Sequence, residues 1–158
     1  MNITIICVGK LKEKYLKEAV LEYTKRLSRF AKVEIIELPD EKIPDKASKK
    51  EEEQVLSKEG NLILSKIKDT SFVVAMCVEG KLISSEEMSE LCQQAAMQKG
   101  HITFIIGGSL GLDERVKKRA DRCISFGRIT LPHQLIRVVL AEQVYRAFKI
   151  SNGEVYHK

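Results

Sequence analysis

Long apolar runs are absent from this sequence. No segment of its 158 residues approaches the roughly 20 consecutive apolar residues that a membrane-spanning helix needs. The opening residues, MNITIICVGKLKEK, also lack the basic flank that precedes the apolar core of a secretory signal. We therefore expect a cytoplasmic protein without membrane association.

Metal-binding spacings are absent as well. The four cysteines form no CxxC pair and have no paired histidine cluster, so we expect no zinc or other metal site. Free cysteines in cytosolic proteins behave as small apolar residues. We expect buried, reduced thiols at Cys7, Cys77, Cys92 and Cys123.

Positive charge, by contrast, is abundant in the last quarter of the chain. Residues 115–158 hold 10 Lys and Arg against 3 Asp and Glu, whereas residues 1–114 hold 17 against 19. A local excess of cations attracts polyanions, because phosphates that pair with Lys or Arg release their counterions. Nucleic-acid binding is one interpretation of this asymmetry, and a solubilising surface is the other.

Strand-like and helix-like segments alternate along the chain. Apolar β-branched runs predict strands at residues 2–8, 33–38, 72–78, 102–106 and 123–126. Apolar residues at spacings of three and four predict helices at residues 10–28, after 48 and after 84. A short basic helix is expected between the fourth and fifth strands, and a last helix at 132–150. This alternation predicts an α/β fold with a parallel-rich sheet and helices on both faces. We expect one domain over residues 1–158, since this length suits a single core.

Three of these helices have recognisable start signals. Ser48 and Glu51 have the spacing of a capping box, and Ser84 or Ser85 can cap the next long helix. Thr130 is a candidate cap for the last helix. Pro132 suits the first turn of that helix, because its missing N–H is not needed there.

A glycine-rich turn is the first candidate for a binding site. The segment ITFIIGGSLGLDE runs from an apolar strand into Gly107, Gly108 and Gly111. Glycines at the carboxyl end of a parallel strand let a ligand approach the backbone amides, because no Cβ intervenes. The spacing is neither GxGxxG nor a P-loop, so a plain strand-to-helix turn remains the alternative.

The last helix is apolar on nearly every side. Its apolar residues are Leu135, Ile136, Val138, Val139, Leu140, Val144, Tyr145, Ala147 and Phe148. Such a helix must be buried on more than one side. We infer a homodimer with this helix at the interface. A helix wholly buried within one subunit is the alternative.

Polar residues interrupt that helix at two places, each with a pair four residues apart. His133 and Arg137 share one face, and so do Glu142 and Arg146. The second pair is typical of an ion pair that supports the helix.

The chain ends in three residues that suit contact with RNA. Tyr156, His157 and Lys158 offer stacking, titration and phosphate pairing. A frayed chain end is the alternative.

Three segments together resemble a known family. The run TLPHQLIRVVLAEQVYRAFKISNGEVYHK, the opening ITIICVGKLKEKY and the turn FIIGGSLGL closely resemble the RlmH (YbeA) family of SPOUT methyltransferases. The resemblance extends from Asn2 to Lys158. It implies a trefoil-knotted α/β domain, active as a homodimer, that uses S-adenosylmethionine to methylate N3 of a pseudouridine in the 23S rRNA of the assembled ribosome.

The resemblance also implies a cofactor pocket. Carried over by position, it comprises Met76, Gly107, Phe126, Gly127, Arg128, Ile129, Thr130 and Leu131. These positions follow the third, fourth and fifth expected strands, where the glycine turn also indicates a pocket. Cys77 departs from the family, whose members usually have an acidic residue there, and this leaves the effect of that position on the cofactor or knot open.

The chemistry implied is methylation of an imide nitrogen, which requires removal of its proton and alignment with the methyl donor. The candidate residues are His133, Arg137, Arg146, Tyr156 and His157, with tail residues from a partner subunit as an option. A neutral His can accept the proton, and a cationic Arg can favour the deprotonated imide. The competing functions are a SPOUT enzyme acting on transfer RNA and a non-catalytic ribosome-binding factor.

Overall fold

The computed structural model describes residues 1–157 and contains five strands and five helices in that range. The strands are β1 (Asn2–Val8), β2 (Lys32–Leu38), β3 (Phe72–Leu82), β4 (His101–Ile106) and β5 (Arg122–Ser125). The helices are α1 (Lys14–Leu27), α2 (Lys49–Lys66), α3 (Ser85–Lys99), α4 (Glu114–Arg119) and α5 (His133–Ser151). The expected alternation of strands and helices is therefore confirmed.

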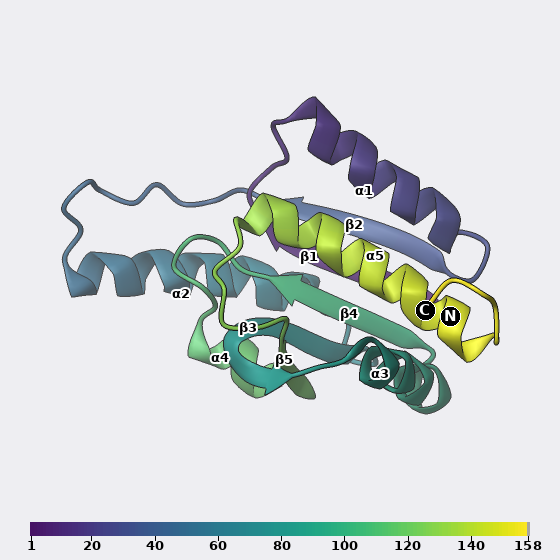
Figure 1. The fold of residues 1–158 in the computed structure, drawn as a ribbon. Helices are drawn as coiled ribbons and strands as arrows, with labels where there is room; N and C mark the ends of the chain where they lie inside the picture. Colours follow the sequence, from purple (N-terminus) through teal and green to yellow (C-terminus); the bar gives the residue numbers. More distant parts are fainter. Residues whose placement is uncertain (158) are drawn as a thin grey trace.

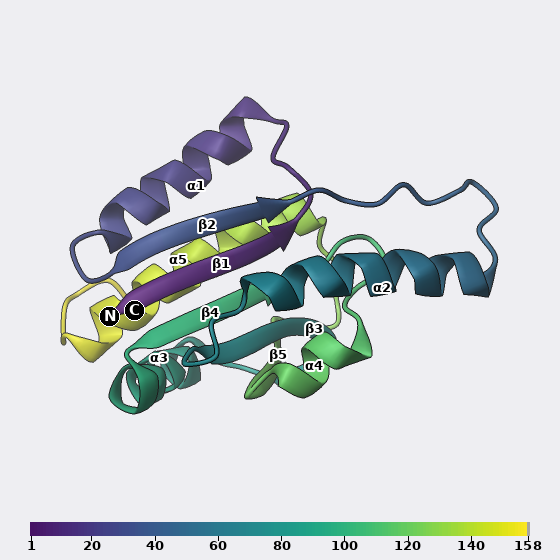
Figure 2. The ribbon, with the colours of Figure 1, turned by 180° about the vertical axis from the view of Figure 1, so that it is seen from behind.

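All strands belong to one parallel sheet in the order β2-β1-β4-β3-β5. Helices α1, α3 and α5 cover one face, and α2 and α4 cover the other (Figures 1 and 2). Alternate residues of β1 point to opposite faces, so Ile5 packs in one core and Ile6 in the other. Because both faces are covered, β1 reads as a continuous apolar run.

Local signals predicted the helix starts well, with one exception. Ser48 and Ser84 each form a complete capping box, with Glu51 and Glu87 respectively. The prediction that Thr130 caps the last helix is wrong, because Pro132 holds the N-cap position and no side chain of the described residues caps the helix there. Residues 126–132 instead run without regular structure toward α5.

Two element boundaries also differ from the prediction. The first helix begins at Lys14, four residues later than expected. Strand β3 continues to Leu82 rather than ending at residue 78, and its pairing with β5 changes register between Met76 and Lys81. Gly80 makes this possible, because a Cβ there would lie 2.8 Å from the backbone of Ile124.

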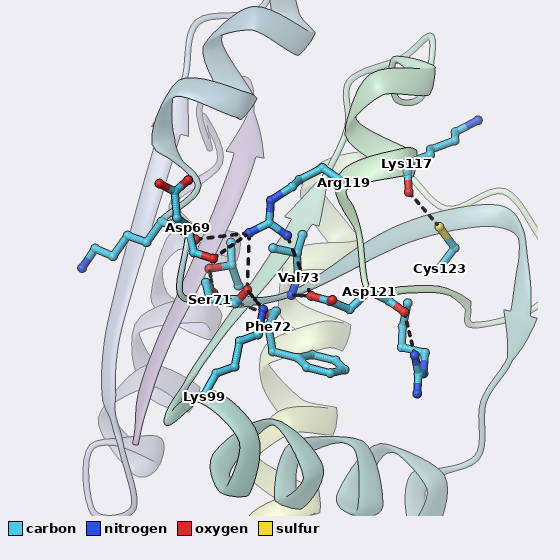
Figure 3. Close-up of polar contacts among 12 residues, drawn as sticks. Asp69, Ser71, Phe72, Val73, Lys99, Lys117, Arg119, Asp121 and Cys123 are labelled. Carbon is cyan, nitrogen blue, oxygen red and sulfur yellow. Dashed lines mark hydrogen bonds and ion pairs between the residues drawn. The ribbon is translucent and has the colours of Figure 1, made fainter.

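A polar network holds the start of β5 against β3 (Figure 3). The Asp121 carboxylate accepts a hydrogen bond from the Val73 amide at 2.8 Å, and the Asp121 amide donates to the Val73 carbonyl at 2.8 Å. Arg119 donates to the carbonyls of Lys68 and Asp69, both at 3.3 Å. These hydrogen bonds fix the start of β5 in the sheet, and thereby the position of the segment that follows β5.

Helix α5 packs on the sheet between α1 and α3, but it is not wholly buried. Leu140 and Val144 face the core, whereas Leu135 on the outer side is 39% exposed and Val138 and Val139 are partly exposed. One chain alone therefore leaves part of the apolar surface of α5 uncovered.

The cysteines are free thiols, as expected from the sequence. All four cysteines are free; Cys7, Cys77 and Cys92 are buried, and Cys123 is partly buried. Burial raises the pKa of Cys92 to about 12. Within residues 1–157, no grouping of three or more His, Cys, Asp or Glu is suited to a metal, and none of the helices could cross a membrane.

Candidate functional site

A cavity of about 590 Å³ lies where β3 changes register and where β4 and β5 end. Four stretches of chain form most of its wall: residues 76–79, 106–112, 124–127 and 129–133. The volume is within the range of small-molecule and cofactor sites. Ligands bind at the carboxyl ends of the strands in open α/β sheets, which is the position of this cavity.

Glycines shape the wall of the cavity. A Cβ on Gly107 would lie 2.5 Å from the Gly111 carbonyl oxygen, so this turn can close only with glycine at 107. Gly111 and Gly127 have φ of 83° and 133°, and the space around each is open. The backbone at these positions is thus accessible to a ligand. This geometry favours the binding-site interpretation over a plain turn.

Most of the expected cofactor residues lie together in this wall. Those lining the cavity are Met76, Gly107, Phe126, Gly127, Ile129, Thr130 and Leu131. Arg128 is exposed and is not part of the lining. The sequence reasoning did not include Glu79 or Lys117, which also line the cavity, because neither belongs to a motif.

His133 lies at the first turn of α5, in the cavity wall. Its ring is close to the end of β1, since a Cβ built on Gly9 would be 3.5 Å from His133 Nε2. Burial, followed by the nearby Arg137 cation, lowers the pKa of His133 below its ordinary value of 6.5. The imidazole is therefore neutral near pH 7 and can accept a proton.

Unlike His133, Arg137 does not line the cavity, and its side chain is only 2% exposed. It donates to the Glu37 carboxylate at 2.8 Å and to the carbonyls of Val8 and Gly9 at 3.1 and 2.7 Å. Its Nε has no hydrogen-bond partner within residues 1–157. Arg137 thus joins α5 to the ends of β1 and β2.

The other expected catalytic residues form a polar cluster near the end of α5. Glu142 accepts hydrogen bonds from Arg146 at 2.5 Å and from the Tyr156 hydroxyl at 3.1 Å. The Arg146 guanidinium lies 4.7 Å from the centre of the Tyr156 ring, a cation–π distance. His157 contacts Arg146 at 3.4 Å and Glu86 of α3 at 2.8 Å.

Glu142 has a larger structural role than the sequence predicted. It does form the expected ion pair with Arg146, but it also binds Tyr156 and so connects the helix to the chain end. Burial, and then the Glu142 carboxylate, raise the pKa of Tyr156 to about 12. The phenol therefore stays protonated at neutral pH and acts as a hydrogen-bond donor.

The end of the described chain folds back onto α5 rather than fraying. The Glu154 amide donates to the Lys149 carbonyl at 2.9 Å, and the Glu154 carboxylate pairs with Lys149 and with Arg29 of the α1–β2 connection. The predicted phosphate contact of Lys158 lies outside the described residues.

The expected catalytic residues thus fall into two groups. His133 is in the cavity wall at the first turn of α5, whereas Arg146 is 13 residues further along it. At a rise of 1.5 Å per residue, these positions are about 20 Å apart along the helix axis. Figure 1 shows the far end of α5 beside the chain termini. Within one chain, the cavity and the polar cluster do not meet.

The whole described chain is similar to proteins of one kind. Residues 1–157 match the family model described as "Predicted SPOUT methyltransferase". The chain is 61% identical to the ribosomal RNA large subunit methyltransferase H 1 of Clostridium perfringens (strain SM101 / Type A), with 100% of both chains covered. It is 59% identical to the ribosomal RNA large subunit methyltransferases H of Streptococcus gordonii and of Lactobacillus acidophilus, again with 100% of both chains covered.

Proposed function

This chain belongs to the SPOUT methyltransferase family and is a methyltransferase; from that premise we propose that it transfers a methyl group from S-adenosylmethionine to N3 of a pseudouridine in the 23S rRNA of the assembled ribosome. The observation that carries the proposal is the glycine-lined cavity in a chain about 60% identical, over its full length, to ribosomal RNA methyltransferases. The family likeness also supports one cytoplasmic SPOUT domain with a trefoil knot.

The cavity fits S-adenosylmethionine in size and in chemistry. Gly111 and Gly127 expose backbone that can bind polar edges of adenine and ribose, and Ile129, which is 81% exposed, offers an apolar contact. We assign the cofactor to the expected residues that line the cavity, and to Arg128 as an exposed neighbour. When bound, S-adenosylmethionine supplies an electrophilic methyl group.

A homodimer resolves the separation between the cavity and the polar cluster. The outer face of α5 is partly apolar, and a two-fold axis would pair it with the same face of a second copy. If the two helices run antiparallel, Arg146, Tyr156 and His157 of the partner subunit approach the cavity. We propose that each active site combines one subunit's cavity with its partner's polar cluster.

In this site, the protein must accept the N3 proton of the pseudouridine before methyl transfer. His133 is neutral at pH 7 and borders the cavity, so it is our candidate acceptor. Arg146 supplies a fixed cation that favours the deprotonated imide, and Tyr156 offers a hydrogen bond and a stacking face. Arg137 acts indirectly, because its hydrogen bonds hold α5, and hence His133, against β1.

The substrate is tested by incubating purified protein with S-adenosylmethionine labelled in its methyl group and with ribosomes, free 23S rRNA or transfer RNA. Mass spectrometry of the nucleosides should find labelled N3-methylpseudouridine only with ribosomes. Label in transfer RNA would replace the proposed substrate. Absence of label from all three, together with absence of cofactor binding, would contradict the enzymatic function.

The composite site is tested by mixing two inactive variants, Gly107→Val and Arg146→Ala, under conditions that exchange subunits. Each mixed dimer would contain one intact site, so about one quarter of the wild-type activity should return. If each active site lay within one chain, the mixture would remain inactive.

A further inference from the structure

One ion pair lies in the wall of the cavity. Lys117 of α4 and Glu79 of β3 are the only charged Lys, Arg, Asp or Glu among the described residues that line it. Lys117 Nζ is 2.5 Å from Glu79 Oε1 and 3.2 Å from Glu114 Oε1. The rest of the lining is apolar, glycine or uncharged polar, apart from the titratable His133.

The fold brings these two residues together from different elements. The register change of β3 carries Glu79 outward, and Gly80 allows the close approach to β5 that this requires. Lys117 projects from α4, and Arg119 at the end of the same helix is engaged in the network at the start of β3 (Figure 3). In Figure 3 the Lys117 ammonium points away from that network.

The pair is poorly suited to a purely structural role. The Glu79 side chain is 63% exposed, and a pair with so exposed a member contributes about 1 kcal/mol or less. Lys117 is more enclosed, at 24% exposure, and its hydrogen bond to Glu79 raises its pKa. Lys117 therefore stays charged at neutral pH, and because its carboxylate partners are exposed, it can bind another anion.

The pair also has a defined place relative to His133. Glu79 and Lys117 lie on the β3–β5 side of the cavity, whereas His133 lies next to Gly9 at the end of β1. Since β4 stands between β1 and β3 in the sheet, the ion pair and His133 border opposite sides of the cavity.

We propose that Lys117 and Glu79 bind the amino-acid end of S-adenosylmethionine, Lys117 the α-carboxylate and Glu79 the α-ammonium. This inference rests on the proposed function. The amino-acid end is the zwitterionic part of the cofactor, with both charges on one carbon, and the ion pair is its electrostatic complement. The uncharged part of the wall is left for the nucleoside.

The test compares three ligands by isothermal titration calorimetry with the purified full-length protein. S-Adenosylhomocysteine has both charged groups, decarboxylated S-adenosylmethionine keeps only the amine, and 5′-methylthioadenosine has neither group. The variants are Lys117→Gln, Glu79→Gln and the matched control Lys118→Gln, whose side chain is exposed on the same helix and outside the cavity.

We expect Lys117→Gln to weaken S-adenosylhomocysteine binding by about 10- to 100-fold, the effect of one charge-assisted hydrogen bond. Its affinity for the other two ligands should match that of the wild type. Glu79→Gln should weaken both amine-containing ligands and leave 5′-methylthioadenosine unchanged. Lys118→Gln should change none.

Two results would overturn the assignment. Equal weakening of all three ligands by Lys117→Gln would mean that the pair only maintains the shape of the cavity, and unchanged affinities would mean that the amino-acid end lies elsewhere. Failure of the proposed function is a separate result: a protein that does not use S-adenosylmethionine would bind none of the three ligands even as wild type, and a different RNA substrate would appear in the labelling experiment and leave these affinities unchanged.

Discussion

The two ends of α5 are built by different means. At its first turn, backbone turns at Gly107, Gly111 and Gly127 shape a cavity. At its last turns, side chains form the site, with Glu142 holding Arg146 and Tyr156. Ligand binding in a cavity lined by backbone depends on steric fit. The activity of a cluster of charged side chains depends on the hydrogen bonds and ion pairs that hold them in position. We therefore expect substitutions at the two ends to change different quantities.

The largest effect is expected for Arg146→Ala. Loss of a cation that stabilises developing negative charge should lower the rate of methyl transfer to ribosomes by about 100- to 1000-fold. Cofactor affinity, measured by calorimetry, should be unchanged, because Arg146 does not line the cavity. Arg122→Ala is the matched control, as it removes a basic residue at the opposite end of β5 from the cavity. Equal rate losses in the two variants would indicate general RNA attraction instead.

Gly107→Val should show the opposite behaviour. The new Cβ would meet the Gly111 carbonyl oxygen at 2.5 Å, and the displaced turn should weaken cofactor binding by about 10- to 100-fold. Ile129→Ala provides a second variant that should fold normally, because this side chain is 81% exposed, and its affinity should fall a few-fold. Unchanged cofactor affinity in both variants would refute the proposed pocket.

Arg137→Ala tests the connection between α5 and β1. Removing its hydrogen bonds to the Val8 and Gly9 carbonyls should lower the free energy of unfolding by about 1–3 kcal/mol, as measured by urea denaturation. Methyl transfer should decline as His133 loses its position. A variant of full stability that is inactive would instead indicate direct contact of Arg137 with the nucleotide.

The smallest effect is expected at Glu59, beneath the glycine turn. This carboxyl is 5% exposed and would lie 3.4 Å from a Cβ on Gly108. Burial raises its pKa, and the Asp40 and Glu41 carboxylates add to the shift, while a hydrogen bond from the Glu41 amide opposes it. The folded state therefore holds the proton more tightly than the unfolded state does.

The sign of the pH dependence follows from that difference. As pH rises from the ordinary carboxyl value through the raised pKa, wild type loses stability that Glu59→Gln, which does not titrate, retains. The difference in free energy of unfolding, variant minus wild type, should be greater at about pH 8 than at about pH 4. A difference independent of pH would contradict the assignment.

Features that depend on neighbouring residues were predictable from the sequence. The strands and helices, the capping boxes at Ser48 and Ser84, and the glycine turn were all located from patterns within a few residues. Seven of the eight cofactor positions, assigned by family likeness, also line one cavity. The prediction that Thr130 caps α5 was wrong, because its segment lines the cavity and the helix begins further along the chain.

The sequence by itself determined the α/β class and the glycine-rich turn, because periodicity, capping and the steric freedom of glycine act over short distances along the chain. Only the tertiary structure decided that Arg137 pairs with Glu37, 100 residues away, that His157 reaches Glu86, and that Lys117 meets Glu79 at the cavity. Such pairs depend on strand order and on a change of register in β3. Those features arise from packing between distant segments and leave no local pattern.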